Sequence, residues 1–231
     1  MKQVMYIPQN DIRFVDSSQI VVKEVLRQLD SVDIKSVADF GCGIGTWLKT
    51  FKDYGISEVK GFDGDWVDKR LLFGNITPKE FETADFENLN NEIPNKKFSL
   101  VLCLEVAEHI TEENSDKLIE HLTQSGNIIL FSAAIPCQGG PGHVNEQWPD
   151  YWAEKFAKYS FIPYDTIRFR IWNDDRVFSW YKQNILFYVC ETEDSLKDLR
   201  KQLLNLSPER NNEVKRLVHP ECYLSKIQSS K

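Results

Sequence analysis

The chain has 231 residues, of which 42% are hydrophobic and 12% aromatic, so it carries enough apolar side chains for the core of one α/β domain. Its net charge of −7 argues against a nucleic-acid partner, because lysine and arginine supply the contacts to phosphates. Five cysteines without a C-x-x-C spacing indicate reduced thiols, and no apolar run is long enough to span a membrane. The first residues also lack the apolar core of a signal peptide, so we expect a cytoplasmic protein.

A helical lead-in is predicted before the first strand. Tyr6 and Phe14 fall in its extended part, and the helix that follows should end at about Leu29. Either Ser17 or Ser18 could cap the start of this helix, because a serine hydroxyl accepts hydrogen bonds from first-turn amides. Apolar side chains recur at helical spacing along the helix, so we expect one of its sides to pack on a sheet.

The stretch 36–47 reads Ser-Val-Ala-Asp-Phe-Gly-Cys-Gly-Ile-Gly-Thr-Trp and organises the first half of the chain. Its first five residues predict a short buried strand, its glycines predict a turn, and a helix is expected from Thr46 to Tyr54. Free amides at the start of a helix can hold an anionic group of a ligand. A turn that binds nothing and a dinucleotide site are the alternatives, although Thr46 stands where the third glycine of a dinucleotide fingerprint would fall.

The signature Asp39-x-Gly41-x-Gly43-x-Gly45 resembles motif I of the class I S-adenosylmethionine (SAM)-dependent methyltransferases. The resemblance implies an α/β fold, a Rossmann-like doubly wound sheet of seven mostly parallel strands with the last strand antiparallel and helices on both faces. It also implies SAM as the cofactor, with amides of the turn on its carboxylate. The residues that it assigns to cofactor binding are Asp39, Gly41, Cys42, Gly43, Gly45, Asp63, Gly64, Asp85, Phe86, Leu104 and Glu105.

A second strand is predicted over 57–63, and it ends in Asp63, about 20 residues beyond the glycine turn. The two oxygens of a carboxylate can each accept a hydrogen bond from one ribose hydroxyl, and the family uses an acid here in that role. Gly64 and Asp65 compete for the same place. Asp65 better suits the cap of a helix expected over 66–72.

A short third strand is predicted over 81–84, directly before Asp85 and Phe86. In the resembling family an acid near this point meets the adenine amino group, and its apolar neighbour stacks on the ring. A simple loop acid is the alternative for Asp85. The family also commonly closes its lead-in over the cofactor, which makes Tyr6 and Phe14 candidate lid residues, with core roles as the alternative.

A nearly continuous apolar run over 98–104 predicts a central parallel strand. The Glu-Val-Ala-Glu-His-Ile segment that follows resembles the segment after the fourth strand of small-molecule methyltransferases. The resemblance implies that Leu104 and Glu105 pass beside the methionine end of the cofactor. His109 is a candidate base or substrate contact, and packing of the loop is its alternative role.

A fifth strand is predicted over 127–134, after a helix over 113–124 that should carry His121 on its solvated surface. The glycine- and proline-rich loop 135–149 then leaves the carboxyl edge of the sheet, where open α/β folds bind ligands. An imidazole can take the proton of a hydroxyl as methyl transfer proceeds, so His143 is the first candidate for a catalytic base. Anchoring of the loop is its alternative role.

The last third of the chain should complete the sheet. A helix is expected over 149–159, and strands over 161–171 and 183–189 should form the antiparallel pair that ends the sheet. Four of the six tryptophans fall near this third. Together with the polar side chains around them they could bind a sugar ring, and packing in the core is their alternative role. These tryptophans are Trp148, Trp152, Trp172 and Trp180.

We therefore expect a methyltransferase domain over 1–190, with its first 33 residues as the helical lead-in, and a helical extension over 191–231. One amphipathic helix is predicted over 194–206, which could dock on the domain, form a homodimer or join another partner. No metal ligands are assigned, because neither H-E-x-x-H nor C-x-x-C spacing occurs, and metal dependence stays open.

Three segments read Gly-His-Val-Asn-Glu-Gln-Trp-Pro-x-Tyr-Trp (142–152), Asp-x-Ile-Arg (165–168) and Trp-Tyr-x-Gln-Asn (180–184). Together they are similar to methyltransferases found with glycan and capsule biosynthesis genes. We therefore predict O-methylation of a sugar hydroxyl, with a small-molecule or glycan acceptor and with His143 or His109 as the base. Methylation of a nitrogen or a carboxylate of a small metabolite is one alternative. A non-catalytic SAM-binding subunit and a dinucleotide-dependent oxidoreductase are the others.

Overall fold

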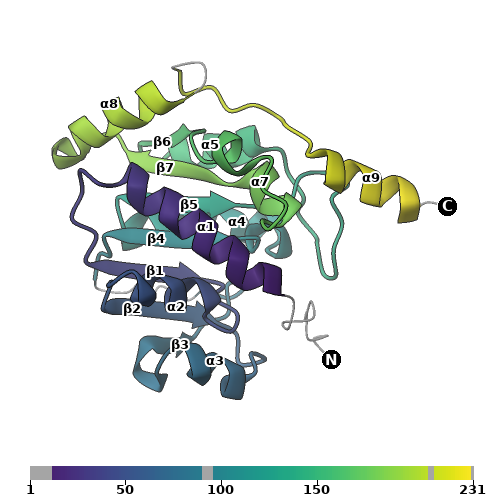
Figure 1. The fold of residues 1–231 in the computed structure, drawn as a ribbon, viewed down its shortest axis with the longest axis horizontal. Coiled ribbons are helices and arrows are strands. Elements are labelled where there is room, and N and C mark those ends of the chain that lie inside the picture. Colours follow the sequence, from purple (N-terminus) through teal and green to yellow (C-terminus); the bar gives the residue numbers. More distant parts are fainter. Residues whose placement is uncertain (1–11, 90–95, 208–210, 230–231) are drawn as a thin grey trace.

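The computed structural model describes residues 12–89, 96–207 and 211–229, so the predicted lid residue Tyr6 lies outside the described residues. Its seven strands are β1 (Ser36–Phe40), β2 (Glu58–Asp63), β3 (Phe81–Thr83), β4 (Leu100–Leu104), β5 (Ile128–Ser132), β6 (Phe161–Tyr164) and β7 (Leu186–Cys190). They form one sheet in the order β3-β2-β1-β4-β5-β7-β6 (Figure 1). β7 runs antiparallel to both of its neighbours, and the other six strands are parallel to one another. The predicted Rossmann-like, mostly parallel sheet is confirmed.

Helices cover both faces of this sheet (Figure 1). The α-helices of the described residues are α1 (Ile12–Gln28), α2 (Thr46–Asp53), α3 (Lys69–Asn75), α4 (Glu112–Ser125), α5 (Pro149–Ala157), α6 (Arg168–Ile171), α7 (Ser179–Asn184), α8 (Lys197–Leu206) and α9 (Pro220–Ser229). Short 3₁₀ helices are η1 (Pro78–Glu80), η2 (Ala107–His109) and η3 (Asp194–Leu196). Side chains of α1, α2, α7 and α8 join the hydrophobic cluster on one face, whereas α4 and α5 supply the cluster on the other face.

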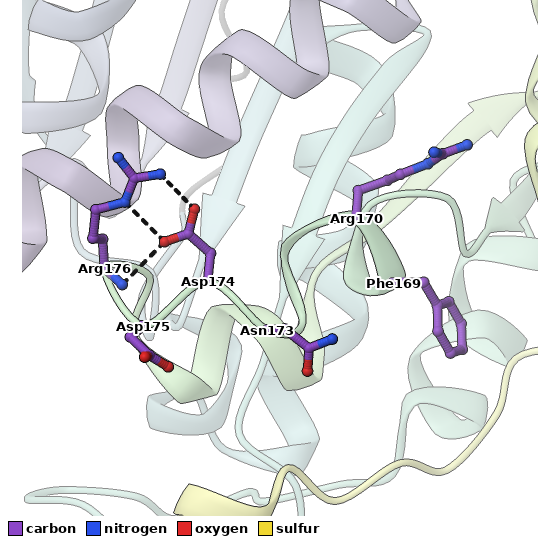
Figure 2. Close-up of a pocket in the computed structure, with 6 residues that line it drawn as sticks. All are labelled: Phe169, Arg170, Asn173, Asp174, Asp175 and Arg176. Atoms are coloured by element: carbon purple, nitrogen blue, oxygen red, sulfur yellow. Dashed lines mark hydrogen bonds and ion pairs between the residues drawn. The ribbon is translucent and has the colours of Figure 1, made fainter.

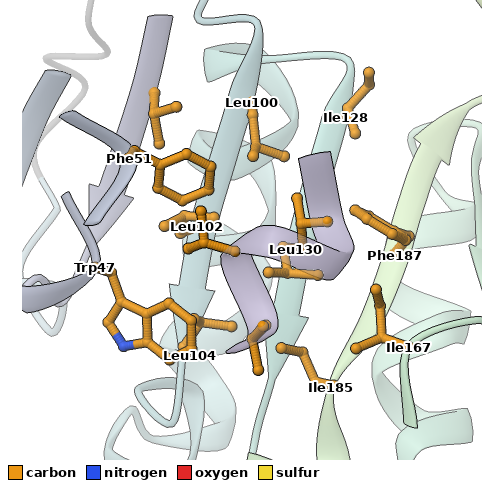
Figure 3. Close-up of a cluster of buried hydrophobic side chains, with 14 of the residues drawn as sticks. Trp47, Phe51, Leu100, Leu102, Leu104, Ile128, Leu130, Ile167, Ile185 and Phe187 are labelled. Carbon is orange, nitrogen blue, oxygen red and sulfur yellow. The ribbon is translucent and has the colours of Figure 1, made fainter. Parts of the chain in front are cut away.

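The central strand β4 is apolar at every position because both of its faces are covered. Leu100, Leu102 and Leu104 point to one face, where Trp47 and Phe51 of α2 lie beside them (Figure 3). The residues between these leucines pack with α4 and α5 on the opposite face. Each fully buried side chain of this kind stabilises the fold by about 1.5–3 kcal/mol. The strand is therefore a rigid base for the segment that leaves its carboxyl end.

The first helix begins earlier than predicted, and its two serines are not caps. The backbone N–H of Phe178 donates to Ser17 Oγ over 3.0 Å, and Ser18 Oγ lies 2.7 Å from Thr50 Oγ1. Both serines are fully buried, so their hydroxyls satisfy polar atoms between α1 and its neighbours. The ring of Phe14 packs on the ring of Phe178, with centroids 4.7 Å apart.

Two local predictions on other helices are wrong. The helix expected over 66–72 begins later, and its cap is Asp68, whose side chain accepts from the backbone N–H of Arg70 over 2.9 Å. Asp65 is therefore not the cap. His121 is buried instead of solvated, because it lies at the edge of the apolar stripe of α4 and widens the side that faces the core.

The strand predicted over 161–171 is wrong in its second half. β6 ends at Tyr164, and the chain then turns into α6, where the guanidinium of Arg168 forms a bidentate ion pair with Asp165. Both side chains are buried, so the pair is shielded from water and fixes the turn. The connection from β6 to β7 consequently passes through α6 and α7 instead of running directly.

The C-terminal segment packs on the domain through α8. Leu199 and Leu203 of this helix are buried in the same cluster as α1. α9 instead leaves Tyr223 and Leu224 more than half exposed and extends away from the sheet (Figure 1). None of the helices within the described ranges is long and apolar enough to cross a membrane.

Candidate active site

The glycine turn after β1 has the backbone that its sequence predicts. Gly41, Gly43 and Gly45 have φ angles of 85°, 52° and 78°, a region that favours glycine. A Cβ on Gly41 would meet Val106 Cγ2 at 2.2 Å, whereas a Cβ on Gly43 would meet nothing within 4 Å. Gly41 therefore packs closely against the segment after β4, and Gly43 borders space that a ligand can enter. The N-cap of α2 is Gly45, which has no side chain to accept from the amides of the first turn.

Asp63 ties the end of β2 to this turn. Its Oδ2 accepts from the backbone N–H of Gly43 and its Oδ1 from that of Gly64, each over 2.7 Å. Burial raises the pKa of this carboxyl group, and the two amides oppose the rise. The Trp66 side chain also donates to this carboxylate, which has about four acceptor sites in all, so Asp63 can hold the turn and still accept from a ligand hydroxyl.

Asp39 lies at the end of β1 with only 1% of its surface exposed. Its Oδ2 has no hydrogen-bond partner among the described residues. Burial, and after it the charge of Asp63, raise the pKa of Asp39 to about 8. A positively charged ligand group beside Oδ2 would provide the missing partner and favour the ionised form. Cys42, the neighbour in the turn, is buried and carries a free thiol.

Asp85 and Phe86 follow β3, as predicted. Asp85 accepts from the backbone N–H of Glu87 over 3.1 Å and from the amide of Asn88 over 2.9 Å, so it organises its own loop. Phe86 is buried, and its ring lies 6.0 Å from that of Phe40. The predicted adenine contacts of both residues stay predictions.

Glu105 follows Leu104 at the carboxyl end of β4 with a φ of 54°, which is uncommon outside glycine. Its carboxylate accepts from the side-chain amide of Asn184 over 3.1 Å and from that of Gln138 over 3.0 Å. Burial raises its pKa, although these hydrogen bonds oppose the rise. The three side chains connect β4, the loop after β5 and α7, and sequence reasoning assigned only Glu105 of the three. Such a backbone outlier, held from three elements, is typical of functional sites.

The two candidate bases lie together. The rings of His109 and His143 meet edge to face, with centroids 4.7 Å apart. His143 Nδ1 lies 2.8 Å from Glu146 Oε1, and its Nε2 lies 4.0 Å from Glu108 Oε1. His109 Nδ1 lies 3.3 Å from the carbonyl oxygen of Gly142. Burial lowers the pKa of His109 to about 4, so its imidazole is neutral at neutral pH.

Two acids of this cluster, Glu108 and Glu146, were not assigned from the sequence. The backbone N–H groups of Val144 and Asn145 donate to the carbonyl oxygen of Glu108, over 2.9 and 3.0 Å, and so place the loop over η2. The signal was present in the sequence, because the Glu-Val-Ala-Glu-His segment holds two acids three residues apart. One ligand atom each from Glu108, His109 and His143 lie within 4.8 Å of one another, so this set could hold a metal ion.

An open hollow of about 490 Å³ lies elsewhere, around the connection between α6 and α7 (Figure 2). In it the guanidinium of Arg176 pairs with the carboxylate of Asp174 over 2.7 and 2.9 Å. The hollow is lined by Phe169, Arg170, Asn173, Asp174, Asp175 and Arg176. None of these residues belongs to the glycine turn or to the histidine cluster, so the hollow is not counted with the site.

Solved proteins share this fold at low sequence identity. Magnesium protoporphyrin IX methyltransferase ChlM from Synechocystis PCC 6803, with bound SAH, is 16% identical with a TM-score of 0.52, over 78% of this chain and 84% of that chain. CalS10, an amino pentose methyltransferase from Micromonospora echinaspora with bound SAM, is 12% identical with a TM-score of 0.55, over 82% and 99%. A chain in the complex between the Haloferax volcanii Trm112 methyltransferase activator and a putative methyltransferase is 13% identical with a TM-score of 0.56, over 79% and 94%.

At these identities the structures establish the fold alone, and a comparison of the sequence with curated proteins finds no match. The sequence itself identifies the family. Residues 17–172 match the family model described as Methyltransferase domain, which covers more than half of the chain. Since that match includes the glycine turn whose signature predicted the cofactor, the chain belongs to this family and is a class I SAM-dependent methyltransferase.

Proposed function

We propose that this methyltransferase transfers the methyl group of SAM to a hydroxyl of a sugar or glycan acceptor. The observation that carries the proposal is the cluster of Glu108, His109 and His143, in which Glu108 and His109 lie in the segment that leaves β4 and His143 lies in the loop after β5. A hydroxyl loses a proton when it is methylated, and an acid with two imidazoles can take it up. A carboxylate acceptor needs no such group. The amino pentose methyltransferase among the structures of this fold is consistent with a sugar acceptor.

The residues at the carboxyl ends of β1 and β2 fit SAM. Asp39 Oδ2 is a buried acceptor without a partner, which suits the amino group of the methionine part. Gly43 borders open space, and the uncapped start of α2 suits the methionine carboxylate. The remaining acceptor sites of Asp63 suit the ribose hydroxyls. When bound, SAM supplies a methyl group on a positively charged sulfur, which an oxygen can attack in line with the breaking bond.

His143 is the first candidate for the base because of its partners. The carboxylate of Glu146 accepts from its Nδ1–H, which leaves the lone pair on Nε2 free to take a proton. This carboxylate also stabilises the imidazolium that forms. His109 is the second candidate, since burial lowers its pKa to about 4. It would instead help to orient the acceptor.

The test is methyl transfer from SAM to a panel of free sugars, sugar nucleotides, amines and carboxylates. Formation of S-adenosylhomocysteine and the position of the new methyl group by NMR identify the acceptor atom. We expect sugar hydroxyls to react, and we expect His143→Ala to lower the turnover by about 10²–10⁴-fold, the range of general-base catalysis. His121→Gln is the control, because His121 lies on α4 outside the cluster. Transfer to amines or carboxylates alone would overturn the proposal. Near-normal turnover of both His143→Ala and His109→Ala would overturn the choice of base.

The proposal has three further parts, which concern the adenine contacts, the domain bounds and the location. Asp85 and Phe86 remain the residues proposed for the adenine, at the edge formed by β3. A domain over 1–190 with an extension over 191–231 is supported by the separate helices α8 and α9, although α8 packs into the common core. A cytoplasmic location agrees with the free state of all five cysteines.

A further inference from the structure

The cluster of Glu108, His109 and His143 has the composition of a metal site. Its three ligand atoms lie within 4.8 Å of one another, and they come from η2 and from the loop after β5. His143 Nε2 is 4.0 Å from Glu108 Oε1, and the two imidazole rings are in contact. Two histidines and one carboxylate are a recurring ligand set for divalent transition metals.

Outer partners orient both imidazoles for this purpose. A backbone carbonyl can only accept, so His109 Nδ1 must donate to the Gly142 oxygen at 3.3 Å, and the lone pair of a neutral ring is then on Nε2. His143 donates from Nδ1 to Glu146 Oε1 over 2.8 Å, which leaves its lone pair on Nε2 as well. Histidines that bind metals commonly donate their other N–H to a carboxylate or a backbone carbonyl in this way.

Glu108 provides an independent observation. Its carboxylate is 1% exposed, and Oε2 has no hydrogen-bond partner among the described residues. Backbone hydrogen bonds from Glu108 itself and from Ala134 offset part of the burial of this carboxylate, but the unpartnered oxygen remains costly unless a cation or a proton compensates it. The carbonyl of the same residue holds the backbone of Val144 and Asn145, so the chain fixes Glu108 and His143 relative to each other.

We propose that Glu108, His109 and His143 bind one divalent transition-metal ion, with Glu146 as the outer partner of His143. Two imidazole ligands favour Zn²⁺, Co²⁺ or Mn²⁺ over Mg²⁺, which prefers oxygen ligands. With metal–ligand bonds of about 2.1 Å, donor atoms at right angles lie about 3 Å apart, so the three donors must close by roughly 1–2 Å. Side-chain rotation of the partly exposed imidazoles provides this closure.

The function of the metal rests on the proposed methylation of a hydroxyl, whereas metal binding itself does not. A fourth position would take the acceptor oxygen, because a bound divalent ion lowers the pKa of water from about 15.7 to about 7 and acts likewise on an alcohol. The hydroxyl proton passes to solvent, a lone pair of the oxygen forms the bond to the methyl carbon, and the carbon–sulfur pair stays on sulfur. His143 cannot be a ligand through Nε2 and a free base at once, so metal dependence decides between these two roles.

The experiment is titration of chelator-treated full-length protein with Co²⁺, without SAM or acceptor. We expect one equivalent to bind and to give d–d absorption bands, with Zn²⁺ displacing it and Mg²⁺ failing to do so. Failure of the sugar-methylation assay leaves this result untouched, so the two proposals can fail separately. Absence of the bands together with an absence of heat in a Zn²⁺ titration would overturn the metal site.

Variants show whether the bound ion is held by these side chains. Glu108→Gln, His109→Ala and His143→Ala should each weaken Co²⁺ binding by at least about 100-fold, and Glu146→Gln by about 10–100-fold, as outer partners do. His121→Gln should bind Co²⁺ like the wild type, since it removes an imidazole from α4. Near-ultraviolet circular dichroism verifies folding, and Glu146→Gln remains informative if a buried variant fails to fold. Equal Co²⁺ affinity across all the variants would refute the assignment.

Discussion

Replacing Asp39 by asparagine tests the charge balance of the cofactor site. The folded protein raises the pKa of this buried carboxyl group from 3.8 to about 8. Between these two pH values the unfolded chain ionises the group, while the folded chain keeps its proton. The unfolded state therefore binds fewer protons, and the free energy of unfolding falls as the pH rises through this window. The Asp39→Asn variant keeps the shape of the side chain but cannot ionise.

The size of the effect follows from the shift. Between about pH 5.5 and about pH 7.5 Asp39 is ionised in the unfolded chain and largely protonated in the folded chain. Over these roughly two pH units the free energy of unfolding should fall by roughly 2–3 kcal/mol, at about 1.36 kcal/mol per unit. Other buried acids contribute to the same slope, but their part is common to the wild type and the variant. The stability of Asp39→Asn relative to the wild type should thus grow by that amount over this interval.

Urea unfolding of the cofactor-free protein at both pH values measures the difference. Asp33→Asn is the control, because the Asp33 side chain is 75% exposed, and it should shift both stabilities equally. Parallel pH profiles of the wild type and Asp39→Asn would refute the raised pKa. Calorimetry with SAM adds a second reading, since loss of a charged hydrogen bond of about 1.5–3 kcal/mol weakens binding by roughly 10–100-fold. Unchanged affinity would separate Asp39 from the cofactor's amino group.

The glycines of the turn should respond differently to alanine. Gly41→Ala should lower the free energy of unfolding by more than about 2 kcal/mol, because the backbone has positive φ and the new Cβ would meet Val106 at 2.2 Å. Gly43→Ala should lower it by about 1 kcal/mol. Its main effect should be on SAM binding, which we expect to weaken by at least about 10-fold. The control is Gly74→Ala in α3, where a Cβ meets nothing within 4 Å, and it should be neutral or slightly stabilising. Identical unfolding curves for the three variants would contradict this reasoning. Arg168→Met should lower the stability by about 3–5 kcal/mol, because it leaves the buried carboxylate of Asp165 unpaired. Adding Asp165→Asn to Arg168→Met should recover part of that loss of stability in the same urea assay. If the losses of the two single variants simply add in the double variant, the ion pair does not couple the two side chains.

Local sequence was enough to predict the sheet where the backbone allows few choices. The turn at Gly41 and Gly43 needs positive φ, and the apolar run of β4 needs cover on both faces. Prediction from local sequence failed where a tertiary contact decides the conformation. The alternating apolar residues of 161–171 resemble a strand, but the ion pair of Arg168 folds their second half into a helix. Ser17 resembles a cap because it precedes an apolar helical pattern. No sequence pattern shows that the backbone of a distant segment will donate to its hydroxyl.

The same distinction holds for the candidate site. Asp63 was predictable because its place at the end of a strand after the glycine turn follows from the order of elements alone. Glu146 and Asn184 were not assigned as site residues, since their partners lie on other elements and their roles depend on loop conformation. His109 and His143 were each proposed singly, yet their contact depends on backbone hydrogen bonds that fold the loop onto η2.

Four carboxyl groups gather where β1, β2 and β4 end, and their charges have to be compensated. Asp39 and Asp63 lie beside the glycine turn, while Glu105 and Glu108 follow β4. Burial and then the charges of Asp39, Glu108 and Glu105 raise the pKa of the Cys103 thiol. No lysine or arginine within the described ranges forms an ion pair with Glu108, whose nearest basic side chain is the imidazole of His143. The amino group and sulfur of SAM would compensate the first pair and a metal ion the second. The site is therefore least stable when both cations are absent, and binding energy from each can offset the cost of burying these acids.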